Sequence, residues 1–135
     1  EVARALTGWS VRPAALGGGF VFRPEAHDAG AKTILGRRFP AGGGEDEGER
    51  VLDLVARHPS TARFVARKLA VRFVSDSPPP ALVDRAADAF RRTDGDVRAT
   101  LAVILHSPEF FSRAAYKSKV KTPFELVASA ARALG

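Results

Sequence analysis

Three side chains that could carry out chemistry lie close together in the sequence: His27, Asp28 and Lys32. An imidazole can exchange a proton near neutral pH, a carboxylate can orient that imidazole, and an ammonium group can hold an anionic oxygen. Loops on a rigid support often carry such groups. These three residues are therefore the candidate catalytic residues, in an uncharacterised hydrolase or a metal-dependent enzyme.

The same segment also has a structural interpretation, which we favour. Asp28 can cap a turn through the backbone, Gly30 can supply a positive φ, and His27 can satisfy a local hydrogen bond. Gly30-Ala31-Lys32-Thr33 lacks the glycine spacing of a phosphate-binding loop. The chain contains no Cys and only three His, so the sequence predicts no metal site and identifies no cofactor.

A net charge of +6 raises the possibility of an anionic partner. The candidate anion-binding residues are Arg63, Arg67, Lys117, Lys119 and Lys121. The first two fall on an edge of one helix and are expected to pair with the acidic residues Glu45, Asp46, Glu47 and Glu49 or to face solvent. Tyr116 is the one aromatic residue beside the lysines, too few for a stacking platform. A weak polyanion-binding module is therefore a second alternative, and nucleic-acid binding is not favoured.

The elements that position these residues are predicted to be mainly α-helical. Residues 1–8 read as the end of a helix, and two β-prone runs, 20–23 and 32–35, predict a small hairpin joined by turn-forming residues. Beyond the glycines at 42–44 the pattern is helical, with a His58-Pro59 junction, an Asp96 N-cap and a capping box from Thr122 to Glu125. The fold predicted is a compact domain of about five or six helices with a small N-terminal β-hairpin.

The helix from Pro59 to about Val74 is expected at the centre of the core, because apolar residues recur on it at helical spacing. Val65, Leu69 and Phe73 are predicted to be among its most buried residues. A short helix is also expected to restart at Ser107.

The 135 residues suffice for one domain. We expect a single helical domain, residues 1–135, cut from a larger protein, with a helix end, hairpin and Gly-rich loops at 1–44 and a helical core at 45–135. No apolar run approaches the roughly 20 residues that span a bilayer.

Several motifs in the same order resemble a known family. They are Arg4-Ala5-Leu6-Thr7-Gly8-Trp9, His27-Asp28-Ala29-Gly30-Ala31-Lys32-Thr33-Ile34-Leu35-Gly36, His58-Pro59-Ser60-Thr61-Ala62-Arg63-Phe64, Ser107-Pro108-Glu109-Phe110 and Lys119-Val120-Lys121-Thr122-Pro123-Phe124-Glu125. Together they resemble the C-terminal part of the bacterial family known as domain of unknown function 1800. The resemblance implies a mainly helical, often exported protein and supplies no catalytic residues.

The function expected from residues and resemblance together is a structural or interaction portion of a larger, exported or periplasmic bacterial protein. The partner expected first is the upstream part of that protein.

Overall fold

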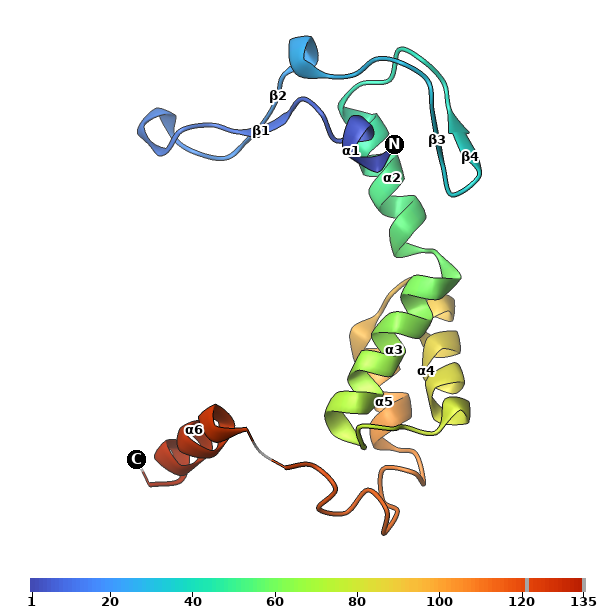
Figure 1. Cartoon of the computed structure of the whole chain (residues 1–135), viewed down its shortest axis with the longest axis vertical. Helices are drawn as coiled ribbons and strands as arrows, with labels where there is room; N and C mark the ends of the chain where they lie inside the picture. Colours follow the sequence, from blue (N-terminus) through green and yellow to red (C-terminus); the bar gives the residue numbers. More distant parts are fainter. Residues whose placement is uncertain (121, 135) are drawn as a thin grey trace. The chain divides into compact units, whose positions relative to one another are not determined.

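The computed structural model describes residues 1–120 and 122–134. The chain forms two compact units, Glu1–Ala56 and Arg57–Gly135. Figure 1 shows strands only in the first of these, while the longer helices run from α2 to the end of the chain. The described residues are mainly helical, with small antiparallel hairpins near the N-terminus, as the sequence predicts.

The first unit contains two helices and two separate hairpins. Its elements are α1 (Val2–Ala5), β1 (Trp9–Val11), β2 (Phe20–Phe22), β3 (Lys32–Ile34), β4 (Arg37–Phe39) and α2 (Glu45–Ala56). Short 3-10 turns cover Ala14–Leu16 and Pro24–Ala26. The expected pairing of 20–23 with 32–35 is wrong, because β2 pairs with β1 and β3 pairs with β4.

The turn between β3 and β4 explains that error. Leu35 and Gly36 both have positive φ, 50° and 76°, which is the conformation of a two-residue type I′ hairpin turn. The strand that follows Gly36 is therefore paired immediately, and β3 has no need of a distant partner. From the sequence alone, Gly36 is expected to end a strand, whereas in the structure it is the second residue of a two-residue turn.

The core of the first unit is small. It contains Ala5, Ile34, Phe39 and Val51, with Leu54 packed against it. Trp9 lies on Gly48 of α2, where a Cβ atom would come within 2.5 Å of the indole ring. A glycine inside a helix is costly, and here it provides the space in which β1 and α2 meet.

The second unit is built on α3 (Pro59–Phe73), α4 (Pro80–Arg92) and α5 (Val97–Leu105), followed by α6 (Pro123–Leu134). The helix boundaries follow their caps. His58 accepts a hydrogen bond from the Ser60 amide at 3.2 Å, and Asp96 accepts from the Arg98 amide at 2.7 Å. His106 contacts the Ala102 carbonyl at 2.8 Å. The residues from 108 to 117 form turns, so the short helix expected after Ser107 is absent.

The helix α3 lies in the core of the second unit, but different residues carry its packing. Ala62, Ala66 and Ala70 are buried, while Leu69 is partly buried. Phe73 is 41% exposed, which contradicts the expectation. Small side chains every fourth residue let α4 and α5 approach α3 closely, and larger residues from α4 and α5, Leu82 and Ile104, fill the space.

Among residues 1–120 and 122–134, no helix is long and apolar enough to cross a membrane.

Candidate functional site

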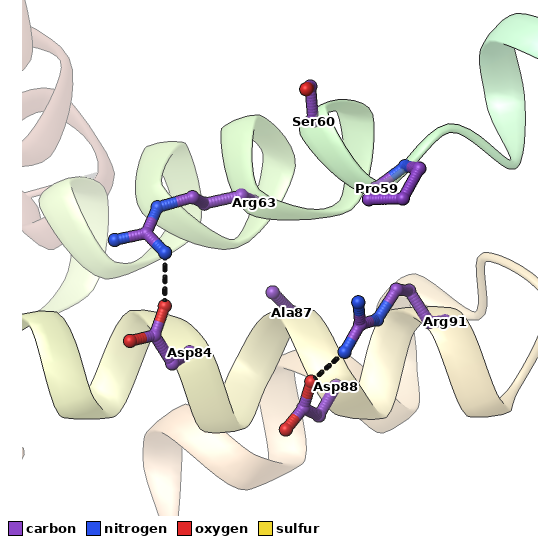
Figure 2. Close-up of a pocket in the computed structure, with 7 residues that line it drawn as sticks. All are labelled: Pro59, Ser60, Arg63, Asp84, Ala87, Asp88 and Arg91. Atoms are coloured by element: carbon purple, nitrogen blue, oxygen red, sulfur yellow. Dashed lines mark hydrogen bonds and ion pairs between the residues drawn. The ribbon is translucent and has the colours of Figure 1, made fainter.

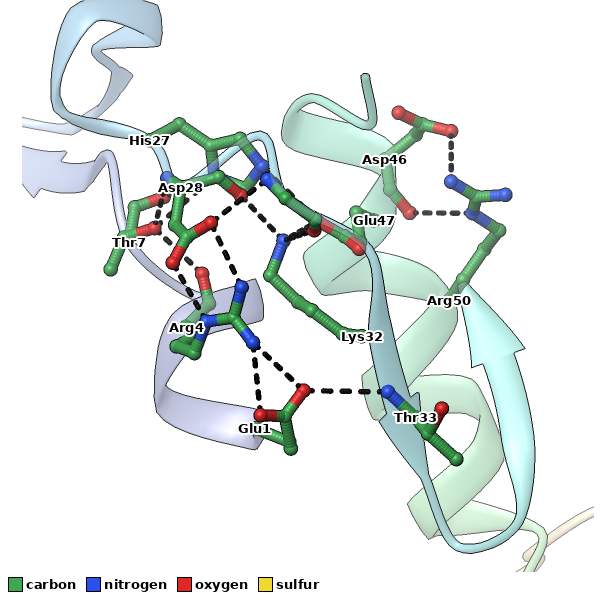
Figure 3. Close-up of polar contacts among 11 residues, drawn as sticks. Glu1, Arg4, Thr7, His27, Asp28, Lys32, Thr33, Asp46, Glu47 and Arg50 are labelled. Atoms are coloured by element: carbon green, nitrogen blue, oxygen red, sulfur yellow. Dashed lines mark hydrogen bonds and ion pairs between the residues drawn. The ribbon is translucent and has the colours of Figure 1, made fainter. Parts of the chain in front are cut away.

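The segment of residues 27–32, called the His27 loop below, packs against α2 (Figure 3). Three buried side chains make this contact: His27 and Lys32 of the loop and Glu47 of the helix. Side-chain exposure is 3% for His27 and 0% for both Lys32 and Glu47. One carboxylate oxygen, Glu47 Oε2, lies 2.8 Å from Lys32 Nζ and 3.1 Å from His27 Nε2. The structure therefore brings two of the three candidate catalytic residues together, and it does so around a carboxylate from another element.

Every hydrogen on the Lys32 ammonium is committed within this unit. Besides Glu47, it donates to the Asp28 carbonyl at 2.5 Å and to the Gly30 carbonyl at 3.0 Å. An ammonium group has three N–H donors, so none remains for a substrate. The two backbone carbonyls and the carboxylate together replace the water that burial removes from the charge.

His27 is held at both ring nitrogens. Its Nδ1 lies 2.8 Å from the Thr7 carbonyl, which can only accept, so Nδ1 carries a hydrogen and donates. Its Nε2 lies 3.1 Å from Glu47 Oε2. His27 links Thr7, which follows α1, to α2 across the loop.

Asp28 points away from His27 and Lys32 and binds α1 instead. Its Oδ2 accepts from Arg4 Nε at 2.7 Å, and its Oδ1 accepts from the Gly30 amide at 2.9 Å. The Arg4 guanidinium first, and the Gly30 N–H second, hold the pKa of the Asp28 carboxyl well below its usual range. The predicted turn cap is present, and it is combined with an ion pair that the sequence did not predict.

Gly30 is required for a different reason from the one expected. It does not have a positive φ. A Cβ at this position would lie 2.8 Å from Arg4 Nη2 and 3.0 Å from Asp28 Oδ1, so glycine leaves room for the Arg4–Asp28 pair. Gly8 does have a positive φ, 83°, and a Cβ there would lie 2.7 Å from the Arg23 carbonyl.

Glu47 is a member of this cluster that is not among the candidate residues chosen from the sequence. From the sequence it is named only as one of four acidic residues expected to pair with Arg63 and Arg67, and it lies in the first turn of α2. The spacing of residues in α2 indicates that Glu47 is buried, because Glu47, Val51 and Leu54 occupy positions i, i+4 and i+7 on one helix face. A carboxylate on the apolar face of a helix predicts a buried cation. Glu47 Oε1 is buried as well and has no hydrogen-bond partner within the described residues.

The four candidate anion-binding residues that the structure describes are exposed, and two of them form ion pairs with acidic side chains. Arg63 binds Asp84 of α4 at 2.6 Å, beside a hollow between α3 and α4 (Figure 2). Lys119 binds Asp76, and Lys117 lies over the Tyr116 ring. Arg67 is exposed on α3, and Lys121 lies outside the described residues. The expected pairing of Arg63 with the acidic start of α2 is wrong, because Asp84 is its partner.

This arrangement can hold a loop in place. The side chains of His27 and Lys32, two of the candidate catalytic residues, are buried in it. Within residues 1–120 and 122–134, no group of three or more His, Cys, Asp or Glu side chains could hold a metal ion. The Lys32 ammonium occupies the position beside Glu47 that a cation would take.

No curated protein and no solved structure is similar to this chain at a significant level. A protein-family model does match it, over residues 1–134. Its members are described as proteins of unknown function. The matched range takes in both compact units and every residue of the His27 loop. The chain therefore belongs to the DUF1800 family.

Proposed function

We propose that this chain is a structural and interaction portion of a larger protein, and that the His27 loop is an internal brace. The observation that carries the proposal is that the polar groups of the loop bind other groups of the same unit. Lys32 donates to Asp28, Gly30 and Glu47, and the two ring nitrogens of His27 contact Thr7 and Glu47. Nothing is left on these two residues for a substrate.

The exposed apolar side chains support the interaction part of the proposal. In the first unit, Val11, Leu16 and Phe20 on and beside the first hairpin are 76%, 69% and 50% exposed. Neighbouring apolar side chains on one surface are typical of contact sites. The hairpin is a candidate surface for the partner expected from the sequence, the upstream part of the same protein.

A brace and a catalytic site predict opposite changes in stability when a loop residue is replaced: a loss for a brace, and no loss or a gain for a catalytic site. The single Trp of the chain, Trp9, packs on α2 and reports on the first unit. We expect His27→Ala and Lys32→Met to lower the urea midpoint followed by Trp9 fluorescence, because each leaves part of a buried polar network unpaired. His58→Ala and Lys68→Met, which lie in the second unit, are the matched controls.

Catalytic residues behave in the opposite way, since active sites are commonly built at a cost in stability. A midpoint that stays the same or rises in both loop variants would contradict the brace. The alternative, a hydrolase using His27, has one observation in its favour: the buried Glu47 Oε1 has no hydrogen-bond partner among the residues that the structure describes. An activity of the longer protein that is lost in His27→Ala, at an unchanged midpoint, would establish that alternative.

A further inference from the structure

A groove lies between the end of α3 and α6, and aromatic side chains from three segments meet in it. Phe73 comes from the last turn of α3, Phe110 from the turns that follow α5, and Phe124 from the first turn of α6. The groove has a volume of about 640 Å³, within the roughly 300–1,000 Å³ that is usual for small-molecule sites. Val120 and Ala128 extend its apolar wall.

Polar contacts between distant parts of the sequence hold the walls of this groove together. Arg72 of α3 binds Glu125 of α6, so the two helices are joined beside the groove. The segment that leads into α6 is attached as well, because Ser118 Oγ donates to the Val74 carbonyl at the end of α3, at 3.0 Å. The aromatic side chains are therefore presented by segments that are tied to one another.

Basic side chains predominate around the apolar wall. The charged residues that line the groove are one acid, Glu125, and three bases, Arg72, Lys119 and Arg132. Arg72 pairs with Glu125, and Lys119 pairs with Asp76, which does not line the groove. Among residues 1–120 and 122–134, Arg132 has no acidic partner. The lining therefore favours an anion, and Arg132 is the cation that remains to bind it.

Arg132 and Phe124 lie on the same side of α6, with a small residue between them. Positions 124, 128 and 132 are four residues apart and follow one helix face, so Phe124 and Arg132 are separated by about 12 Å along the axis. Ala128 leaves space over the turn between them. Because helical side chains lean toward the N-terminus, the Arg132 side chain is directed over that turn, toward the aromatic end of the groove.

We propose that this groove binds a small organic anion with an aromatic body, such as an aryl carboxylate. Its rings pack edge-to-face against Phe73, Phe110 and Phe124, and its carboxylate accepts charge-assisted hydrogen bonds from the planar fork of the Arg132 guanidinium. A second copy of the chain is a poor occupant, because it carries a net charge of +6 toward a basic lining. The proposal concerns the second unit and goes beyond the role proposed for the His27 loop.

The test compares two ligands of the same shape, 2-naphthoate and its neutral amide, 2-naphthamide. Each is titrated into the ¹⁵N-labelled chain, and the amide signals of α6 and of the last turn of α3 are followed by NMR. We expect 2-naphthoate to bind with a dissociation constant of roughly 1 mM or lower, as its size allows. The amide should bind about fivefold more weakly, because it lacks the charge that Arg132 pairs with.

Variants assign the two halves of the ligand to their residues. Arg132→Gln should weaken 2-naphthoate by about fivefold and leave 2-naphthamide unchanged, because only the charged ligand loses a partner. Arg98→Gln removes an exposed guanidinium on α5 and is the matched control. Phe73→Ala should weaken both ligands, whereas Phe64→Ala, at an exposed position elsewhere on α3, should weaken neither. Unchanged signals away from the groove show that each variant is folded.

Three results would overturn the proposal: no shift of these amides with 2-naphthoate, equal binding of the two ligands, or equal effects of Arg132→Gln and Arg98→Gln. The same titration of the longer protein is a further test. Shifts at the same amides would support the proposal, and their absence there would mean that another segment fills the groove, which also overturns it. The Trp9 midpoints that test the brace are independent of these measurements, so either proposal can fail alone.

Discussion

At the scale of single residues, Glu47 is the centre of the first unit. One oxygen of its carboxylate serves Lys32 and His27 together, and all three side chains are removed from water. Ion pairs of this kind seldom add net stability compared with apolar residues of the same size, but the loss of one member leaves a buried charge without compensation. The brace is therefore sensitive to any change at position 47.

We expect Glu47→Gln to destabilise the first unit by about 3–5 kcal/mol, because the Lys32 ammonium would remain buried without its counter-charge. Urea unfolding followed by Trp9 fluorescence measures the effect. Glu49→Gln is the matched control, since Glu49 is an exposed carboxylate on the same helix. Equal midpoints for the two variants would mean that the Glu47 carboxylate does not hold the loop.

At the scale of elements, caps and turns fix where each helix begins and ends. The capping box of α6 is present: the Thr122 amide donates to Glu125 Oε2 at 3.0 Å, and the Glu125 amide donates to Thr122 Oγ1 at 3.3 Å. The Thr122 hydrogen bond first, and the Arg72 guanidinium next, lower the pKa of Glu125 to about 2. The same carboxylate thus begins the helix and ties it to α3.

The lowered pKa of Glu125 sets a pH dependence for α6. Protonation of Glu125 is opposed in the folded state, so its contribution to stability is complete above the ordinary glutamate pKa of 4.5 and is lost as pH falls through about 2. We expect the amide signals of the first turn of α6 to shift over this acidic range in an NMR titration. Glu125→Gln should abolish that dependence, and an unchanged profile in the variant would assign it to another group.

Element boundaries follow from the sequence because their causes are local. The His58, Asp96 and Thr122 caps are each formed by residues two or three positions apart. The sequence predicts the last two as caps and His58-Pro59 as a helix junction. Strand pairing and burial depend on residues far apart. The Leu35–Gly36 turn pairs β3 with β4, and Glu47 is a buried partner of Lys32 because the fold brings the loop onto α2.

At the scale of the whole molecule, the chain has two hydrophobic cores that share no residue. One is formed by α1, β3, β4 and α2, and the other by α3, α4 and α5 with the residues that follow. Each core encloses its own apolar residues, so a cavity made in one removes contacts from that core alone. We therefore expect each unit to have a stability of its own.

Leu82→Ala tests this division, because Leu82 is fully buried in the second core. We expect a loss of about 2–5 kcal/mol in that unit, from the lost apolar contacts and the cavity left behind. Hydrogen exchange of the α4 amides should show it, while the Trp9 unfolding midpoint of the first unit stays unchanged. A fall in that midpoint would mean that the two cores unfold together. Phe64→Ala, at an exposed position on α3, is the control.

The burial of Lys32 also makes its amine a chemical reporter of how often the first unit opens. Acylating reagents attack a lysine only where its amine contacts solvent, and the amine of Lys32 has no such contact while the loop is closed against α2. Its rate of acylation therefore counts the openings of the first unit. Lys68 and Lys117, on the surface of the second, calibrate the reagent in the same tube.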